Sequence, residues 1–255
     1  IQTTSTINGR NITAADIQML DGSITSGGNM LLATPDGVNG GSIVFNGGQL
    51  YSFTDLTLSG RNFLDNGSAN PYEFNNTRFA GGELSFGITG TLAFNGTAWE
   101  ADTFRLGRRA SDAGPEQRPD LELGEGTVLK ALTLMDMHLN SLANSGTVAS
   151  LGDTQIDAAD RVTNDAAGVM TTENNSSLTT PTLTNAGTWV AALNDTENGL
   201  VEWKVDFIDN QTRGKIAAAD VWTLESVNGG ASTFRNKGEV SSSVALNANL
   251  QTLSN

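Results

Sequence analysis

Three short segments decide the fold predicted for this chain: LANSGTV at residues 142–148, VTN at 162–164 and LTNAGTW at 183–189. Each segment holds an asparagine two positions after an aliphatic residue, and Asn144, Asn164 and Asn185 follow one another at a period of about 20 residues. Such a period is typical of a solenoid, in which each repeat stacks on the next and cannot bury its apolar side chains alone. The stretch 142–189 therefore predicts stacked β-coils.

The recurring asparagine has a physical reason. Asparagine tolerates the left-handed backbone of a tight corner, and its amide can bond to the equivalent amide of the next coil. The glycine that follows each asparagine is expected to permit a sharp bend. We therefore expect the three asparagines to stack on one another. We also expect the apolar residues of these coils to point into the cylinder: Leu142, Val148, Ile156, Val162, Leu183 and Trp189.

Composition agrees with a narrow β-cylinder and limits the partners. Of the 255 residues, 38% are hydrophobic, which is too many for disorder, and only 6% are aromatic, which is few for a thick globular core. The net charge of −14 disfavours nucleic acid and anionic membrane surfaces as partners. The chain lacks cysteine, so it has no disulfides or thiolate sites, and it lacks an apolar run of 18 residues, so we expect no membrane insertion.

A second repeat argues for one continuous architecture over residues 1–255. The segments ITAAD at 12–16, IDAAD at 156–160 and IAAAD at 216–220 match closely, with one copy near each end and one in the middle. The β-branched residues that flank them and the missing 3.6-residue apolar stripe argue against helix. We therefore predict a single all-β domain, a right-handed parallel β-helix.

Two segments interrupt the coil pattern. Residues 107–126 carry mixed charges and two prolines, which exclude a central strand and predict a projecting charged loop. Residues 200–208 alternate strictly between apolar and polar side chains over a length unusual for a solenoid strand. This pattern predicts a hairpin outside the helix at 198–224, with Trp203 partly exposed.

The coil motif resembles the filamentous-haemagglutinin-like exoproteins. An aliphatic residue, asparagine, glycine and a second aliphatic residue at 20-residue spacing, together with segments such as GSITSGGNMLLA at 22–33, carry the resemblance over roughly residues 1–60, 130–192 and 230–245. These proteins are large bacterial adhesins exported by two-partner secretion, and they are similar to autotransporter passengers. The resemblance implies a right-handed parallel β-helix on a secreted, cell-surface protein, with roles such as adhesion and biofilm formation.

Candidate site residues are few. His138 is the one histidine, and it shares a strand face with Asp136; without a third ligand at a recognisable spacing, a solvated strand face is the preferred interpretation. Glu100 and Asp102 also share a face, as glycosidase carboxylates would, but 28 acidic residues produce such pairs by chance. We therefore expect no catalytic residues, no metal and no cofactor. The residues that remain as binding candidates are Arg108, Arg109, Arg118 and Trp203.

Three function classes are compatible with the sequence. The preferred one is a non-catalytic stalk or adhesin at the bacterial cell surface or outside the cell, with a glycan or a cell-surface protein as partner. The second is an extracellular structural protein that stacks end to end into a fibre or surface layer, because residues 1–7 and 244–250 are β-prone and almost uncharged. The third is a polysaccharide lyase, glycosidase or tailspike on a β-helix. The first is preferred because polar residues are spread along the repeats, whereas enzymes concentrate them on a few adjacent coils.

Overall fold

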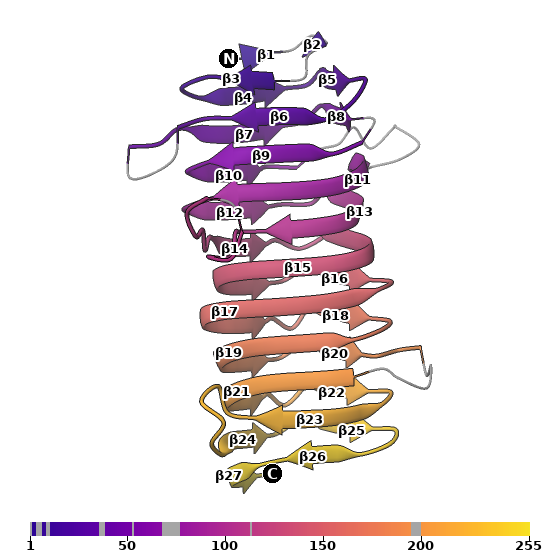
Figure 1. The fold of residues 1–255 in the computed structure, drawn as a ribbon. Coiled ribbons are helices and arrows are strands. Elements are labelled where there is room, and N and C mark those ends of the chain that lie inside the picture. The colour runs from indigo at the N-terminus through magenta and orange to yellow at the C-terminus, as the bar shows by residue number, and fades with distance from the viewer. Residues whose placement is uncertain are drawn as a thin grey trace.

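The chain folds into a β-solenoid. The computed structural model describes residues 2–3, 7–8, 11–35, 39–52, 54–67, 77–112, 114–194 and 200–255, and within these ranges it contains strands and no helix. Each turn of the chain places one strand on each of three faces, which we call faces A, B and C. The strands at the front of Figure 1 run leftward and those behind run rightward as the chain descends from the N-terminus, so the coil is right-handed.

Neighbouring strands on each face pair in parallel, as the sequence predicts. Face A holds β3 (Asn11–Thr13), β6 (Met30–Ala33), β9 (Leu56–Gly60), parts of β11 (Thr77–Ile88), β13 (Ala98–Leu106), β15 (Val128–Asn144), β17 (Asp153–Asn164), β19 (Ser176–Asn185) and β21 (Leu200–Asn210), and then β23 (Val221–Glu225) and β26 (Leu246–Ala248).

Face B holds β1 (Gln2–Thr3), β4 (Ile17–Leu20), β7 (Ser42–Asn46), β10 (Asn62–Asp65), β12 (Thr91–Phe94), β14 (Asp120–Leu123), the last parts of β15, β17, β19 and β21, and then β24 (Ser232–Asn236) and β27 (Leu250–Ser254). Face C holds β2 (Ile7–Asn8), β5 (Ser23–Ser26), β8 (Gln49–Ser52), the first parts of β11, β13 and β15, and then β16 (Thr147–Ser150), β18 (Val169–Thr172), β20 (Thr188–Ala191), β22 (Lys215–Ala218) and β25 (Glu239–Ser242).

The predicted asparagine stack is present, and it is longer than the regular period indicates. From one coil to the next, the Nδ2 of each asparagine donates to the Oδ1 of the following one at 2.8 Å. The ladder comprises Asn144, Asn164, Asn185, Asn210, Asn236 and Asn255. Its first four members are fully buried. On the N-terminal side the same column continues with Leu123 and Phe94, so the hydrogen-bonded ladder begins at Asn144.

The backbone explanation expected for the ladder is wrong. Among the described residues, the non-glycine residues with positive φ are Asp21 and Ala192, so the ladder asparagines do not adopt the left-handed region. The following glycines are also not left-handed. Instead, a Cβ atom at Gly187 would collide with the carbonyl oxygens of Gly168 and Asp165 in the preceding coil. Glycine is therefore needed because consecutive coils approach closely at this corner.

The inside of the cylinder is packed with apolar side chains along its described length. All six residues predicted to point inward are at most 2% exposed, which confirms the register of the central coils. Aromatic rings form two groups. Phe45, Phe63, Phe86, Phe94 and Trp99 pack in the N-terminal half with ring centroids 5.1–6.4 Å apart. The rings of Trp189, Trp203 and Trp222 form a tilted and an edge-to-face contact, with centroids 4.9 and 4.8 Å apart.

The external hairpin predicted at 198–224 is not formed by the described residues of that range, 200–224. Strand β21 pairs in parallel with β19 on one side and with β23 on the other, with Trp203 opposite Leu178 and Leu224. It is therefore a regular part of the coil that turns the corner from face A to face B. Trp203 is 1% exposed and lies in the core, so the predicted partial exposure of its ring is also wrong.

Candidate functional site

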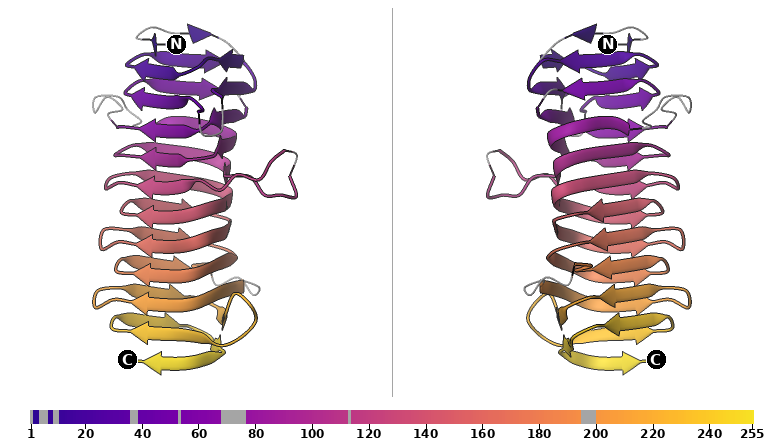
Figure 2. Two further views of the ribbon diagram at one scale, coloured as in Figure 1. Left: turned by 90° about the vertical axis from the view of Figure 1, so that its left-hand side faces the viewer. Right: turned by 90° about the vertical axis from the view of Figure 1, so that its right-hand side faces the viewer.

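A charged loop projects from the corner between faces A and B, as the sequence predicts (Figure 2). It leaves the coil after β13 and returns at β14, so the projection ends before Asp120, and residues 120–123 of the predicted loop belong to face B. Two backbone hydrogen bonds close its base: Arg108 N to Gln117 O at 2.8 Å, and Gln117 N to Arg108 O at 2.9 Å. Gly107 has a φ of +83°, and a Cβ there would meet the backbone of His138, so this position requires glycine.

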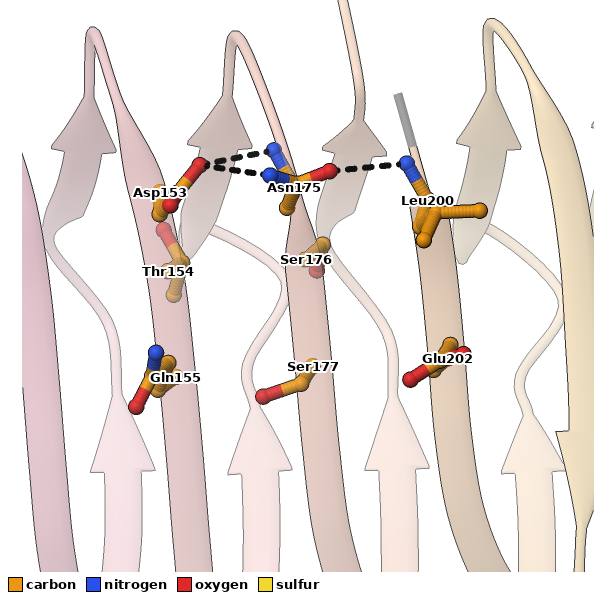
Figure 3. A pocket seen from close by; sticks show the side chains of 8 residues that line it. All are labelled: Asp153, Thr154, Gln155, Asn175, Ser176, Ser177, Leu200 and Glu202. Atoms are coloured by element: carbon orange, nitrogen blue, oxygen red, sulfur yellow. Dashed lines mark hydrogen bonds between the residues drawn. The ribbon is translucent and has the colours of Figure 1, made fainter. Parts of the chain in front are cut away.

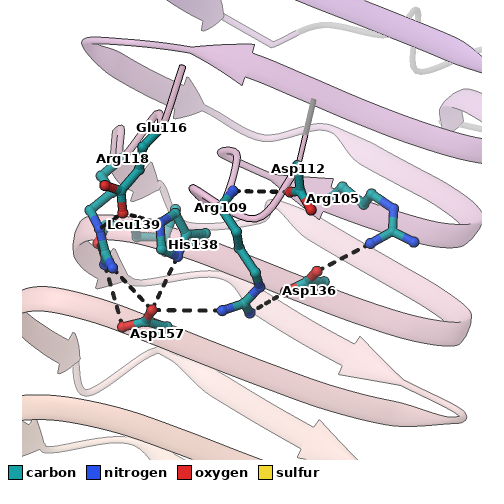
Figure 4. A network of polar contacts seen from close by, with 9 residues as sticks. All are labelled: Arg105, Arg109, Asp112, Glu116, Arg118, Asp136, His138, Leu139 and Asp157. Atoms are coloured by element: carbon teal, nitrogen blue, oxygen red, sulfur yellow. Dashed lines mark hydrogen bonds and ion pairs between the residues drawn. The ribbon is translucent and has the colours of Figure 1, made fainter. Parts of the chain in front are cut away.

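Two arginines of the loop, Arg109 and Arg118, fasten it to face A, and Arg105 of β13 joins the same network (Figure 4). The guanidinium of Arg118 binds both carboxylate oxygens of Asp157, with its Nη2 at 3.1 Å and its Nη1 at 3.3 Å. Arg109 places its Nη2 2.6 Å from Asp136 Oδ1, and Arg105 binds the other oxygen of Asp136 at 3.2 Å. Because Asp136 and Asp157 lie on consecutive coils, the loop is tied to β15 and β17 together.

His138 lies beneath this loop. It alternates outward with Asp136, as the strand pattern predicts, but only 6% of its side chain is exposed because Glu116 and Arg118 cover it. Its Nε2 is 2.7 Å from Glu116 Oε1. Its Nδ1 is 3.1 Å from Asp157 Oδ2, but the geometry of that contact does not make a hydrogen bond. The solvated strand face expected for His138 is therefore wrong, because a buried ring joins the loop to the coil.

Electrostatics reinforce the attachment of the loop. The hydrogen bond with His138, followed by that with Arg118, lowers the pKa of Glu116 below its ordinary value of 4.5. Burial alone would lower the pKa of Arg118, but hydrogen bonds to Asp157 and Glu116 outweigh this effect and raise it. The pKa of Arg105 is raised chiefly by its hydrogen bond to Glu83. Each shift favours the charged form, so the ion network persists at neutral pH.

The four binding candidates from the sequence have different outcomes. Arg109 and Arg118 are engaged in holding the loop, and Trp203 is in the core. Arg108 sits at the loop base with no hydrogen bond or ion pair from its side chain to any described residue. Sequence reasoning missed Asp157. The repeat carried a signal for it, because Asp157 occupies the position of His138 one coil further on.

Glu100, which the sequence places in a possible carboxylate pair with Asp102, is engaged in an ion pair between coils. Glu100 accepts a hydrogen bond from Lys130 at 2.9 Å, which links adjacent coils. A shallow groove of about 190 Å³ crosses face A further down, lined in part by Asp153, Gln155 and Glu202 (Figure 3). Asp153 and Asn175 form a short hydrogen-bonded chain across the groove to the backbone of Leu200. These contacts join coils, whereas the side chains of Gln155, Ser177 and Glu202 make no hydrogen bond or ion pair with a described residue.

The described residues show neither a metal cluster nor a membrane-spanning helix. Within the described ranges, no three His, Cys, Asp or Glu side chains are grouped so that they could hold a metal ion. None of these ranges contains a helix with the length and apolar character needed to cross a membrane. Comparison with protein-family models, curated proteins and solved structures finds no match to this chain.

Proposed function

We propose that this chain is a non-catalytic rod of a secreted bacterial surface protein and that it mediates adhesion through its projecting loop. The observation that carries the proposal is the loop at 107–119, which stands out from a regular cylinder and is fastened to two coils by arginine–carboxylate pairs. Loops on rigid scaffolds are the usual sites of recognition. A loop that exists only to connect β13 and β14 would not need this attachment.

Rigidity of both parts supports binding. The continuous apolar core, and from Asn144 onward also the asparagine ladder, hold each coil at a fixed height on its neighbour. The ion network then fixes the loop on that surface before any partner arrives. Binding by a pre-ordered loop loses less conformational entropy than binding by a free one, so a small contact area can give useful affinity. This arrangement suits a stalk that presents a recognition element to a glycan or a cell-surface protein.

The test is adhesion of particles coated with the protein. In one variant, residues 109–116 are replaced by a two-residue Asn-Gly turn between Arg108 and Gln117, whose backbone pairing is suited to such a turn. In the matched control, residues 227–230, another connection at the A-to-B corner, are shortened instead. We expect the first variant to lose adhesion to host-cell or extracellular-matrix surfaces and the control to retain it.

Two outcomes would contradict the proposal. Equal adhesion by the loop-shortened protein and the wild type, with both folded by circular dichroism, would remove the loop from the function. Release of reducing or unsaturated sugar ends from a polysaccharide panel would replace the non-catalytic role with an enzymatic one.

A further inference from the structure

A pocket of about 310 Å³ opens beside the base of the loop, on face A. Its walls come from three consecutive coils and from the loop itself: Thr57, Ser85, Phe86, Gly87, Arg105, Gly107, Arg108 and Asp112. A volume of this size is at the lower end of the range for small-molecule sites. Polar groups in this pocket and beside it have hydrogen-bonding capacity that no described residue uses.

The guanidinium of Arg108 is the first such group. No described residue forms a hydrogen bond or ion pair with it, whereas the three other arginines of the cluster, Arg105, Arg109 and Arg118, are all paired with carboxylates. Its position is nevertheless defined, because it lies between Gly87 and Gly114. A Cβ at Gly87 would come within 3.3 Å of Nη2, and one at Gly114 would collide with Nη1. A held guanidinium with unused donors is suited to bind a carboxylate through two hydrogen bonds.

Gln117 supplies the second unused group. Its side chain is 2% exposed, and its Oε1 accepts no hydrogen bond from the described part of the protein. This oxygen converges with Arg108 Nη2 and Ser59 Oγ on the outward side of Gly87, at 3.0, 3.3 and 3.5 Å from the position of a Cβ there. A buried acceptor without a donor is unfavourable by about 1–3 kcal/mol. This oxygen lies beside the pocket wall at Gly87 and is not itself part of the lining.

The acidic side chain in the pocket, Asp112, limits further which kinds of ligand fit. The carboxylate of Asp112 lines the same space and accepts a hydrogen bond from Arg109 N at 3.0 Å. Its charge favours a ligand hydroxyl and disfavours a second anionic group near it. The site therefore combines a guanidinium that no described residue pairs with and a carboxylate acceptor, which matches a molecule that bears one carboxylate and several hydroxyls.

We propose that this pocket binds a carboxylate-bearing sugar of the hexuronic acid class. Its carboxylate would pair with Arg108, and its hydroxyls would donate to Asp112. The inference rests on the proposed adhesive function, for which it names the ligand class and the contact residues. The net charge of −14 makes the rest of the surface unfavourable for such a ligand, so binding would be confined to this basic spot.

Calorimetric titration of the purified protein with glucuronate- and galacturonate-containing oligosaccharides tests the proposal. Oligosaccharides with neutral hexoses of the same linkage and their sulfated forms serve as comparisons. We expect uronate binding that weakens with salt and that is at least tenfold tighter than neutral or sulfated binding. Arg108→Ala should weaken it at least tenfold and Arg108→Lys less. Arg161→Ala, which changes an exposed arginine on face B, should have no effect.

A second substitution keeps the test independent of the loop's own folding. Thr57 lies on β9 and lines the pocket without contacting the ion network, so Thr57→Glu adds a negative charge and should also weaken uronate binding at least tenfold. The proposal is overturned by unchanged affinity in both Arg108→Ala and Thr57→Glu, by equal binding of neutral or sulfated sugars, or by no uronate binding at millimolar concentration. Coated-particle adhesion without uronate binding would overturn this inference alone, and uronate binding without adhesion would overturn the proposed function alone.

Discussion

Replacing Asn164 with alanine removes a middle rung of the asparagine ladder. Asn164 Nδ2 donates to Asn185 Oδ1 at 2.8 Å and to the carbonyl of Thr188 at 3.2 Å, and its Oδ1 accepts from Asn144 Nδ2 at 2.8 Å. The substitution leaves Asn185 Oδ1 without its donor and removes one of the two acceptors of Asn144 Nδ2, which keeps the carbonyl of Val169 at 3.4 Å. An unsatisfied buried polar group costs about 1–3 kcal/mol, so we expect the free energy of unfolding to fall by this amount.

The matched control is the same substitution at the last rung. Asn255 is exposed, and it accepts one hydrogen bond, from Asn236. Water can replace that bond, so Asn255→Ala should change the free energy of unfolding by no more than about 0.5 kcal/mol. Asn164→Leu separates lost hydrogen bonds from lost volume, because leucine fills the space but still removes the hydrogen bonds to both neighbouring amides.

Urea denaturation, followed by fluorescence of the buried tryptophans, measures the difference. Hydrogen exchange adds a local readout, because stability in a solenoid is transmitted mainly between neighbouring coils. We expect protection to fall first at the amides of β17 and β19. The reasoning is refuted if Asn164→Ala and Asn255→Ala shift the urea midpoint equally, or if Asn164→Leu restores wild-type stability.

Further predictions concern the core, a buried carboxylate and the loop. Leu183→Asp, at a fully buried position, should cost at least about 4 kcal/mol because it places a charge between coils without a partner; an unchanged thermal midpoint would contradict this. Asp65→Ala should lower the free energy of unfolding by about 1–3 kcal/mol for each donor left unpaired, including Trp99 Nε1, which donates to Asp65 Oδ2 at 2.8 Å. Asp65→Asn keeps an acceptor and should lower it less. Equal losses of stability for the two variants in chemical denaturation would argue against this role for the carboxylate. The pKa of Glu116 is lowered in the folded chain, so its contribution to loop docking is complete above about pH 4.5 and is lost as the pH falls through the lowered pKa. Acidification should therefore increase proteolysis of the loop. A Glu116→Gln protein with the same pH profile would show that the contact with His138 does not hold the loop.

The sequence alone determined the solenoid and the register of its central coils. Apolar residues alternate inward, and an asparagine recurs at each equivalent corner, because stacked coils require the same side chain to meet itself. The repeat can be read from the sequence, so Asn144, Asn164 and Asn185 indicate stacked coils without any knowledge of the fold. The repeat of Ile12, Ile156 and Ile216 also marks inward positions correctly. The structure, however, places Ile12 and Ile156 on face A and Ile216 on face C, so this repeat identifies strands and not equivalent corners.

Only the tertiary structure decided where longer segments go and what the loop touches. Strict alternation in 200–208 is compatible with an external hairpin or a coil strand, because a period of two fixes the faces of a strand and not its neighbours. The parallel pairing of β21 with β19 shows that this segment is a coil strand, and it buries Trp203. The ladder continues through Asn210 only because the chain closes a longer turn there. The loop contacts of Asp157, His138 and Gln117 likewise depend on groups that the fold brings together across coils. No local sequence pattern could therefore specify which charged residues form pairs. Nor could it show that Arg108 makes no ion pair with a described carboxylate.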